Sequence, residues 1–216
     1  MADFAIQRKT MVDNQIRTMD VQDLAVIDAF STVAREAFVP AATAAFAYID
    51  RPTDLGGGRA LMQPGPLARL MQLALPLPGE KVLVVGGATG YTAALIADIG
   101  AEVVSLEEDA GLAATARTAL AGTTVTVAEG PLTAGWDAAA PYDLVFFDGA
   151  IEVLPEAIAA QVAEGGRIVA IEGAGLSARA VVRVKSSGRL SPRMGDRKST
   201  RLNSSHEWIS RMPSSA

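Results

Sequence analysis

Residues Lys81 to Glu108 read KVLVVGGATGYTAALIADIGAEVVSLEE, and their pattern indicates the architecture of the chain. The opening segment of this stretch, KVLVV, is a short apolar and β-branched run, which is typical of a strand buried on both faces of a parallel sheet. The run ends at GGATG (86–90), where small residues allow a tight turn and a close approach of a ligand to the backbone. The alanine-rich segment 91–99 then predicts a helix packed on the sheet.

An acidic pair, Glu107 and Glu108, follows a second predicted strand over residues 101–106. Glu107 lies 17 residues after Gly90. A carboxylate at this strand tip is placed to accept hydrogen bonds from both hydroxyls of a ribose. The free N–H groups in the first turn of the helix face the same place. Either feature alone fits a plain βα turn or a solvated acid, but together they indicate a nucleoside-binding βαβ unit.

The remaining sequence continues the alternation of strands and helices. After residue 109 the patterns predict a helix at 110–120, strands at 123–128 and 143–148, a helix at 154–162, a strand at 167–171 and an edge strand at 179–185. This order predicts an α/β fold with a Rossmann-like doubly wound sheet. Ligands in such sheets bind at the carboxyl ends of the strands, where Gly86, Glu107, Gly130 and Asp148 fall.

The residues before the glycine turn predict a helical lobe and a long loop. Residues 3–46 read as helices, and Asp20 or Asp23 is placed to cap the second one. Its expected apolar stripe is Leu24, Ile27, Phe30 and Val33. Residues 49–66 are rich in Gly and Pro and predict a loop that serves as a lid or substrate rim. A helix at 66–75 leads into the first strand.

Composition excludes several classes of function. Half of the 216 residues are hydrophobic, which is ample for a buried core. The chain has no cysteine, which excludes disulfides and thiolate metal sites and suits a cytoplasmic location. No signal peptide or membrane span is expected. The net charge of −5 and the lack of a basic stripe before residue 179 argue against nucleic acid as a partner, and no metal is expected.

The last 21 residues, DRKSTRLNSSHEWISRMPSSA (196–216), differ from the rest in kind. They have little hydrophobic periodicity and resemble a translated sequencing adaptor, so we expect a non-native tail and a natural chain ending at about Gly195. The histidine at 206 therefore receives no functional weight. The expected organisation is one domain over 1–195, with a lobe and loop at 1–78 and a cofactor-binding sheet at 79–195.

Several motifs outside the glycine turn resemble one known family. They are MVDNQI (11–16), REAFVP (35–40), AYIDRP (47–52), Gln63-Pro64, VSLE (104–107) and EGGR (164–167). Over roughly residues 8–185 the chain resembles the protein-L-isoaspartate O-methyltransferase family. The resemblance implies a class I methyltransferase fold, S-adenosylmethionine as cofactor, and methylation of the carboxylate of isoaspartyl residues in damaged proteins. It assigns no oligomeric state.

The resemblance also implies site residues. The expected cofactor-binding residues are Gly86, Gly87, Gly90, Tyr91, Glu107, Glu108, Gly130 and Asp148. The expected substrate loop includes Arg59, Gln63 and Pro64. The family's loop usually reads Gly-Gln-Thr-Ile-Ser-x-Pro, so the two hydroxyl positions are Ala60 and Met62 here, and no catalytic residue is assigned.

Other departures follow the same comparison. The glutamate usual before the glycine turn is Val84, and the aspartate usual after the third strand is Pro131. Arg59 could supply a positive group for a carboxylate, but we expect it to be a solvated loop residue, since arginines are mostly exposed.

Three functions remain open at this point. The first is an isoaspartyl methyltransferase whose activity is reduced or altered by the loss of the loop hydroxyls. The second is a non-catalytic S-adenosylmethionine-binding paralogue. The third is an NADP-dependent reductase, because the glycine turn also resembles that of short-chain dehydrogenases. Against the third, 80 residues precede the turn and no Tyr-x-x-x-Lys motif is present.

Overall fold

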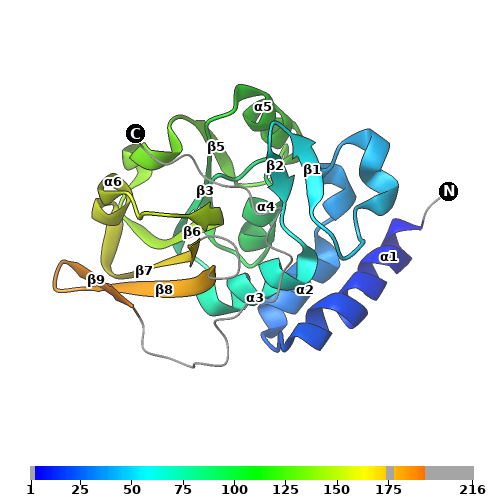
Figure 1. Ribbon diagram of the computed structural model, residues 1–216, viewed down its shortest axis with the longest axis horizontal. Helices are drawn as coiled ribbons and strands as arrows, with labels where there is room; N and C mark the ends of the chain where they lie inside the picture. Colours follow the sequence, from blue (N-terminus) through cyan, green and yellow to red (C-terminus); the bar gives the residue numbers. More distant parts are fainter. Residues whose placement is uncertain (1–2, 174–177, 193–216) are drawn as a thin grey trace.

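A computed structural model of the chain describes residues 3–173 and 178–192 and is dominated by one twisted sheet (Figure 1). Its seven described strands lie in the order β5-β4-β3-β6-β7-β8-β9. The first five are parallel, and β8 and β9 are antiparallel to their neighbours. The strands are β3 Lys81–Val85, β4 Glu102–Glu107, β5 Thr126–Glu129, β6 Tyr142–Ile151, β7 Val162–Glu172, β8 Arg179–Ser186 and β9 Arg189–Pro192.

Side chains of β3 alternate between two separate cores. Val82 and Val84 pack with the N-terminal lobe and helix α4 (Tyr91–Asp98) on one face of the sheet. Leu83 and Val85 pack on the other face with residues of β6, β7 and helix α6 (Glu156–Ala160). Because both faces are covered, the strand needs apolar side chains at successive positions, as its sequence predicts.

Helices cover both faces of the sheet, so the predicted doubly wound architecture is confirmed. The α-helices are α1 Phe4–Met11, α2 Leu24–Thr32, α3 Pro64–Ala74, α4 Tyr91–Asp98, α5 Ala110–Ala119 and α6 Glu156–Ala160. A π-helical turn, Val12–Ile16, extends α1, and short 3₁₀ turns occupy Arg17–Met19, Arg35–Phe38, Ala41–Phe46, Leu132–Ala134 and Asp137–Ala139.

The predicted N-terminal helical lobe is present, and one of its two possible caps is used. The Asp23 carboxylate accepts from the Val26 N–H at 3.0 Å and so satisfies a free donor at the start of α2. The expected stripe on α2 was partly wrong, because Leu24 is 70% exposed while Val26 is buried. The buried lobe residues belong to the same core as one face of the sheet, so the lobe holds a fixed position beside β3.

The segment 49–66 is more ordered than its Gly/Pro content predicts. Strands β1 Thr53–Gly56 and β2 Arg59–Leu61 pair as an antiparallel hairpin, and α3 starts at Pro64 instead of residue 66. The glycines at the hairpin tip, Gly56, Gly57 and Gly58, all have positive φ, which explains their residue type. Strand β8 was expected at an edge but pairs with β9 on its outer side.

The expected tail at 196–216 lies outside the described residues. The division of residues 1–195 into a lobe and a cofactor-binding part stays a prediction.

Candidate functional site

The predicted glycine turn closes β3 and starts α4. The N–H groups of Gly86 and Gly87 donate to the Leu106 carbonyl on β4, at 2.9 and 3.1 Å. Gly86 and Gly90 have φ of 76° and 95°, in the region that favours glycine. A Cβ on Gly87 would lie 2.1 Å from the Ser105 Oγ on β4, so a larger residue requires that hydroxyl to move. The turn is therefore tied closely to the neighbouring strand.

Glu107 is the last residue of β4 and is fully buried beside this turn. Its Oε2 accepts from the Ala88 N–H at 2.8 Å, and its Oε1 accepts from the N–H groups of Glu108 at 3.0 Å and Asp109 at 3.1 Å. Backbone donors from both flanking segments thus fix the carboxylate over the turn. The predicted position of this acid beside Gly86 agrees with the geometry.

Arg59 lies on the same carboxylate. Its Nη1 and Nη2 donate to Oε1 and Oε2 of Glu107, both at 2.8 Å, and Nη2 also donates to the Gly86 carbonyl at 3.2 Å. The side chain of Arg59 is 14% exposed and that of Glu107 is 0% exposed. The expectation of a solvated loop arginine was wrong, because the β1–β2 hairpin carries this residue over the end of the sheet.

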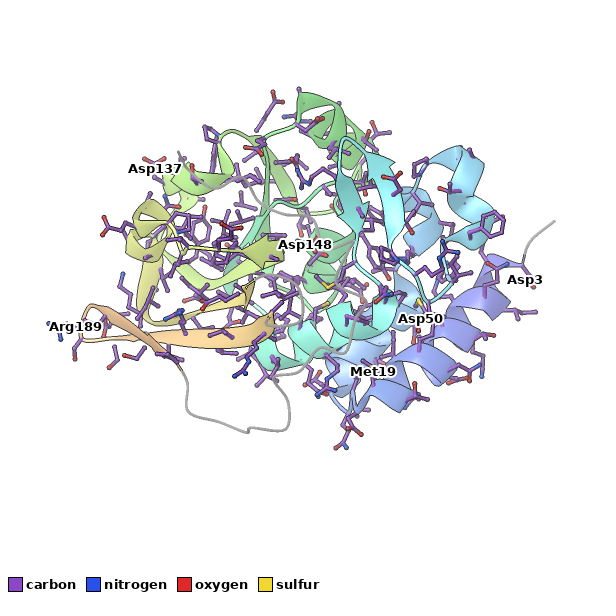
Figure 2. All side chains as sticks on the ribbon, viewed as in Figure 1. Asp3, Met19, Asp50, Asp137, Asp148 and Arg189 are labelled. Carbon is purple, nitrogen blue, oxygen red and sulfur yellow. The ribbon has the colours of Figure 1, made fainter. Side chains whose placement is uncertain are left out.

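A second buried acid, Asp148, lies within β6, the strand on the other side of β3. Figure 2 shows it near the centre of the molecule, whereas Asp137 and Arg189 lie at the periphery. Burial raises the pKa of the Asp148 carboxyl to about 6. A hydrogen bond from Thr92 and the positive charges of Arg59 and Arg35 act in the opposite direction and lower this pKa, but they do not cancel the effect of burial. The site therefore holds two acids that differ strongly in how well their charge is compensated.

Arg35 is a buried cation close enough to Asp148 to affect its pKa. It belongs to the REAFVP motif (35–40), but the motif alone did not indicate its role. Its Nε donates to the Ala47 carbonyl at 2.9 Å and its Nη2 to the Met62 carbonyl at 2.8 Å. Its guanidinium also lies over the Tyr91 ring, 4.8 Å from the centroid. Burial lowers the pKa of Arg35. Both its carbonyl partners are distant in sequence, so no local pattern could have indicated these contacts.

Tyr91 directs its ring into the core. It packs against Phe30 and Phe38, with ring centroids at 6.1 and 5.5 Å, and is fully buried. Burial raises the pKa of its phenol. The predicted cofactor contact by Tyr91 therefore has only its backbone available at the start of α4, and the side chain joins the lobe to the sheet.

The remaining predicted site residues lie around the same strand ends. Glu108 is exposed, and the Gly130 N–H donates to the Glu107 carbonyl at 3.1 Å. Met62 is 8% exposed and Pro64 is buried at the start of α3, while Gln63 and Ala60 are half-buried. Thr92, which reasoning from the sequence missed, lies in the first turn of α4 beside Asp148.

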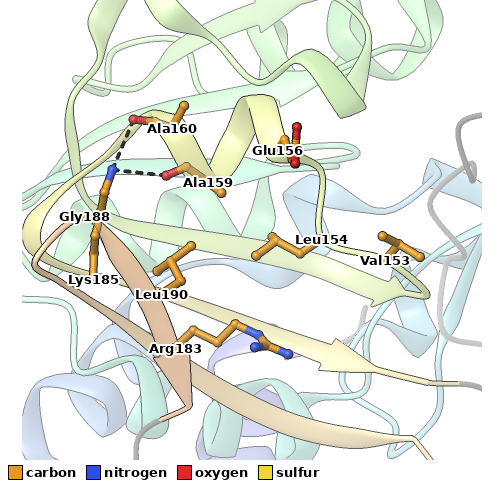
Figure 3. Close-up of a pocket in the computed structure, with 9 residues that line it drawn as sticks. All are labelled: Val153, Leu154, Glu156, Ala159, Ala160, Arg183, Lys185, Gly188 and Leu190. Carbon is orange, nitrogen blue, oxygen red and sulfur yellow. Dashed lines mark hydrogen bonds between the residues drawn. The ribbon is translucent and has the colours of Figure 1, made fainter.

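A cavity elsewhere in the molecule lies far from this site in the sheet order. It has a volume of about 490 Å³ and lies between α6 and strands β8 and β9, which are separated from β4 by three strands (Figure 3). Its two cations already have partners, since Lys185 donates to the carbonyls of Ala159 and Ala160 and Arg183 pairs with Glu172. Within residues 3–173 and 178–192, no cluster of three or more His, Cys, Asp or Glu could hold a metal ion, and no helix has the length and apolarity needed to cross a membrane.

Comparison with known proteins gives one consistent result. The family model described as protein-L-isoaspartate(D-aspartate) O-methyltransferase matches residues 6–193. A protein-L-isoaspartate O-methyltransferase of Methylorubrum populi is 42% identical over 164 residues, which are 75% of this chain and 77% of that protein. One of Koribacter versatilis is 39% identical over 191 residues, 87% of this chain and 86% of that protein. The chain belongs to this family.

Solved structures agree with that membership. A protein-L-isoaspartate O-methyltransferase structure superposes with a TM-score of 0.74 and 25% identity, over 86% of this chain and 62% of that one. A Plasmodium falciparum protein, described as a candidate member of the same family and solved with S-adenosyl-L-homocysteine, has a TM-score of 0.75 and 16% identity, over 86% and 92% of the two chains. The latter likeness shows the fold, which is the predicted class I methyltransferase type.

Proposed function

We propose that this chain uses S-adenosylmethionine to methylate the carboxylate of isoaspartyl residues in damaged proteins. The observation that carries the proposal is the buried Glu107 carboxylate, fixed by backbone N–H groups at the end of β4 beside the glycine turn of β3. This is the position at which doubly wound folds hold a ribose. Family membership supports methyl transfer over the nicotinamide-dependent reduction that the same turn allows.

The residues at this site are of the types that bind an adenosine-bearing cofactor. The small residues Gly86, Gly87 and Ala88 add little side-chain bulk of their own beside a bound ligand, and Glu107 would hold the ribose. When bound, S-adenosylmethionine supplies a methyl group on a positively charged sulfur, which an anionic carboxylate oxygen can attack. The chain's own part is to position the acceptor and exclude water, and such positioning can supply about 7–11 kcal/mol.

The acceptor side departs from the family loop. Ala60 and Met62 replace the hydroxyl residues, and the Met62 side chain is almost fully buried. An acceptor carboxylate that lacks hydrogen-bond donors binds more weakly, so turnover of an isoaspartyl peptide is expected to be below that of relatives with the hydroxyl loop. We also propose a cytoplasmic location, because a chain without cysteine suits a reducing compartment.

Calorimetry and single-turnover methylation test the proposal together. The full chain is titrated with S-adenosylmethionine, S-adenosylhomocysteine and NADPH, and labelled S-adenosylmethionine is then offered with an isoaspartyl peptide or its aspartyl isomer. We expect binding of both sulfur compounds and label transfer to the isoaspartyl peptide only. Glu107→Gln should weaken S-adenosylhomocysteine binding by about tenfold or more, through loss of a charged acceptor. Selective binding of NADPH would overturn the assignment.

A further inference from the structure

The Glu107 carboxylate has no acceptor capacity left for a ribose. Two carboxylate oxygens offer about four lone-pair positions. Five hydrogen bonds already reach them, three from backbone N–H groups and two from Arg59. Because Arg59 supplies two of these five bonds, a ribose whose hydroxyls donate to Glu107 competes with Arg59 for the same two oxygens.

Arg59 is the partner that can leave. The backbone donors at Ala88, Glu108 and Asp109 belong to the turn and to the end of β4, so they move only with the sheet. Arg59 is the first residue of β2, the shorter strand of the β1–β2 hairpin, and this hairpin is a separate two-stranded sheet. The three glycines before it have exposed backbones, with no atom within 4 Å of a Cβ position. A small rotation at this tip would withdraw the guanidinium and leave the acid in place.

An anionic acceptor needs a cation at this site. Glu107 and Asp148 are both acids, and the interaction of their charges is one of the effects that raise the pKa of Asp148. Arg35 is 0% exposed and donates two of its nitrogens to main-chain carbonyls, so it cannot reach an incoming protein. Arg59 is partly exposed and already binds one carboxylate through both terminal nitrogens. A guanidinium is also the side chain best suited to bidentate binding of a carboxylate.

We propose that Arg59 is the residue that recognises the acceptor carboxylate in this chain, and that it rests on Glu107 until the cofactor's ribose takes that acid. The inference deepens the proposed function and rests on it. Arg59 immediately precedes Ala60 on β2, so the cation stands next to the positions where the family loop carries hydroxyls. Displacement of Arg59 by the ribose then links binding of the cofactor to binding of the acceptor. The acceptor therefore binds well only after the cofactor.

The first test compares the wild type with Arg59→Gln, which installs the glutamine usual in the family loop. S-adenosylhomocysteine is titrated by calorimetry, so no turnover is needed. Because the ribose no longer competes with a bidentate cation, R59Q should bind it about tenfold tighter or more. With S-adenosylhomocysteine saturating, an isoaspartyl peptide should bind R59Q at least about tenfold more weakly than the wild type. Arg51→Gln, an exposed arginine of the same loop, should change neither affinity.

The second test starts from the wild type and adds one conservative variant. The wild type should bind the isoaspartyl peptide measurably only when S-adenosylhomocysteine is present, and a peptide with the α-carboxylate replaced by a carboxamide should lose that gain. Arg59→Lys keeps the charge without the bidentate geometry, so both affinities should fall between those of the wild type and R59Q. This variant keeps the test informative if R59Q fails to fold.

The outcomes separate this inference from the proposed function. If neither wild type nor R59Q binds S-adenosylhomocysteine, the proposed function is overturned and the inference with it. If both bind it and R59Q binds no tighter, or if peptide affinity is unchanged by R59Q, only the role of Arg59 is overturned.

Discussion

Two buried acids with different surroundings define the site at the scale of single residues. Glu107 has a full set of donors, three of them main-chain groups that cannot be lost without unfolding. Asp148 has a hydrogen bond from Thr92 and the more distant charges of Arg59 and Arg35, and its pKa is raised to about 6 by burial. Fixed dipoles stabilise a buried carboxylate well, whereas distant charges compensate burial only in part.

The raised pKa of Asp148 predicts a pH-dependent cost to stability. Its folded-state pKa of about 6 lies above the ordinary value of 3.8, so the folded protein binds the proton more tightly than the unfolded chain. The charged carboxylate therefore costs stability above about pH 6, and this cost disappears as the pH falls toward 4. Asp148→Asn should stabilise the protein by about 1–3 kcal/mol at pH 8 and by little at pH 4.

Urea denaturation at pH 8 and pH 4 measures this difference. Asp50→Asn, at an exposed aspartate, is the matched control and should leave stability nearly unchanged at both values. A D148N variant that is less stable than the wild type at pH 8, or equally shifted at both pH values, would contradict the account.

At the scale of elements, the site depends on how closely the glycine turn packs on β4. Gly87 does not have a positive φ, so the obstacle to alanine there is lack of space, because the Ser105 Oγ lies 2.1 Å from a Cβ position. That hydroxyl is buried and has no hydrogen-bond partner. Gly87→Ala should therefore destabilise the protein by about 1–3 kcal/mol through overpacking.

A second substitution tests the cause. Ser105→Ala removes the clashing oxygen and loses no hydrogen bond, so it should recover most of the stability lost in G87A. Thermal unfolding of both single variants and the double variant measures the coupling. If the stability effects of G87A and S105A simply add in the double variant, the destabilisation by G87A does not come from contact with the Ser105 hydroxyl.

A further prediction concerns the two positions in and after β2 at which the family loop carries hydroxyl residues. Ala60→Thr combined with Met62→Ser returns both hydroxyls, and turnover of an isoaspartyl peptide should rise severalfold, because the acceptor gains hydrogen-bond donors. The exchange at Met62 also removes a buried apolar side chain, so a loss of stability of about 1–3 kcal/mol should accompany it. Single-turnover rates and melting temperatures are measured on the same preparations. An unchanged rate in a folded variant would show that these positions do not limit activity.

Elements were predictable from sequence where local chemistry decides them. The run from Val82 to Val85 and the glycines after it predicted a buried strand and a turn, and both are present. The segment 49–66 was expected to be a loop because Gly and Pro dominate it, yet strand pairing turned part of it into a hairpin. Pairing between short strands depends on their neighbours more than on intrinsic preference.

At the scale of the whole molecule, the least predictable contacts are those between distant segments. Arg59 reaches Glu107 across 48 positions, and Arg35 reaches Met62 across 27. The general tendency of arginine to be exposed predicted the wrong surroundings for Arg59, because it does not register a buried acid elsewhere in the chain. The predicted order of strands was enough to place Glu107 on β4 and Asp148 on β6, on either side of β3. The contacts of Arg59 and Arg35 with this region are seen only in the folded chain.

The end of the chain gives a prediction for the whole molecule. Strand β9 ends at Pro192, so a chain stopping at Gly195 keeps every described strand. Residues 196–216 are polar with little apolar periodicity, and a segment of that composition contributes little buried area. Removing them should leave the melting temperature within about 2 °C of the full chain, since a larger shift requires a change of order 1 kcal/mol. Scanning calorimetry and S-adenosylhomocysteine affinity compare the two chains, and a clear loss of either on truncation would mean that these residues pack on the fold.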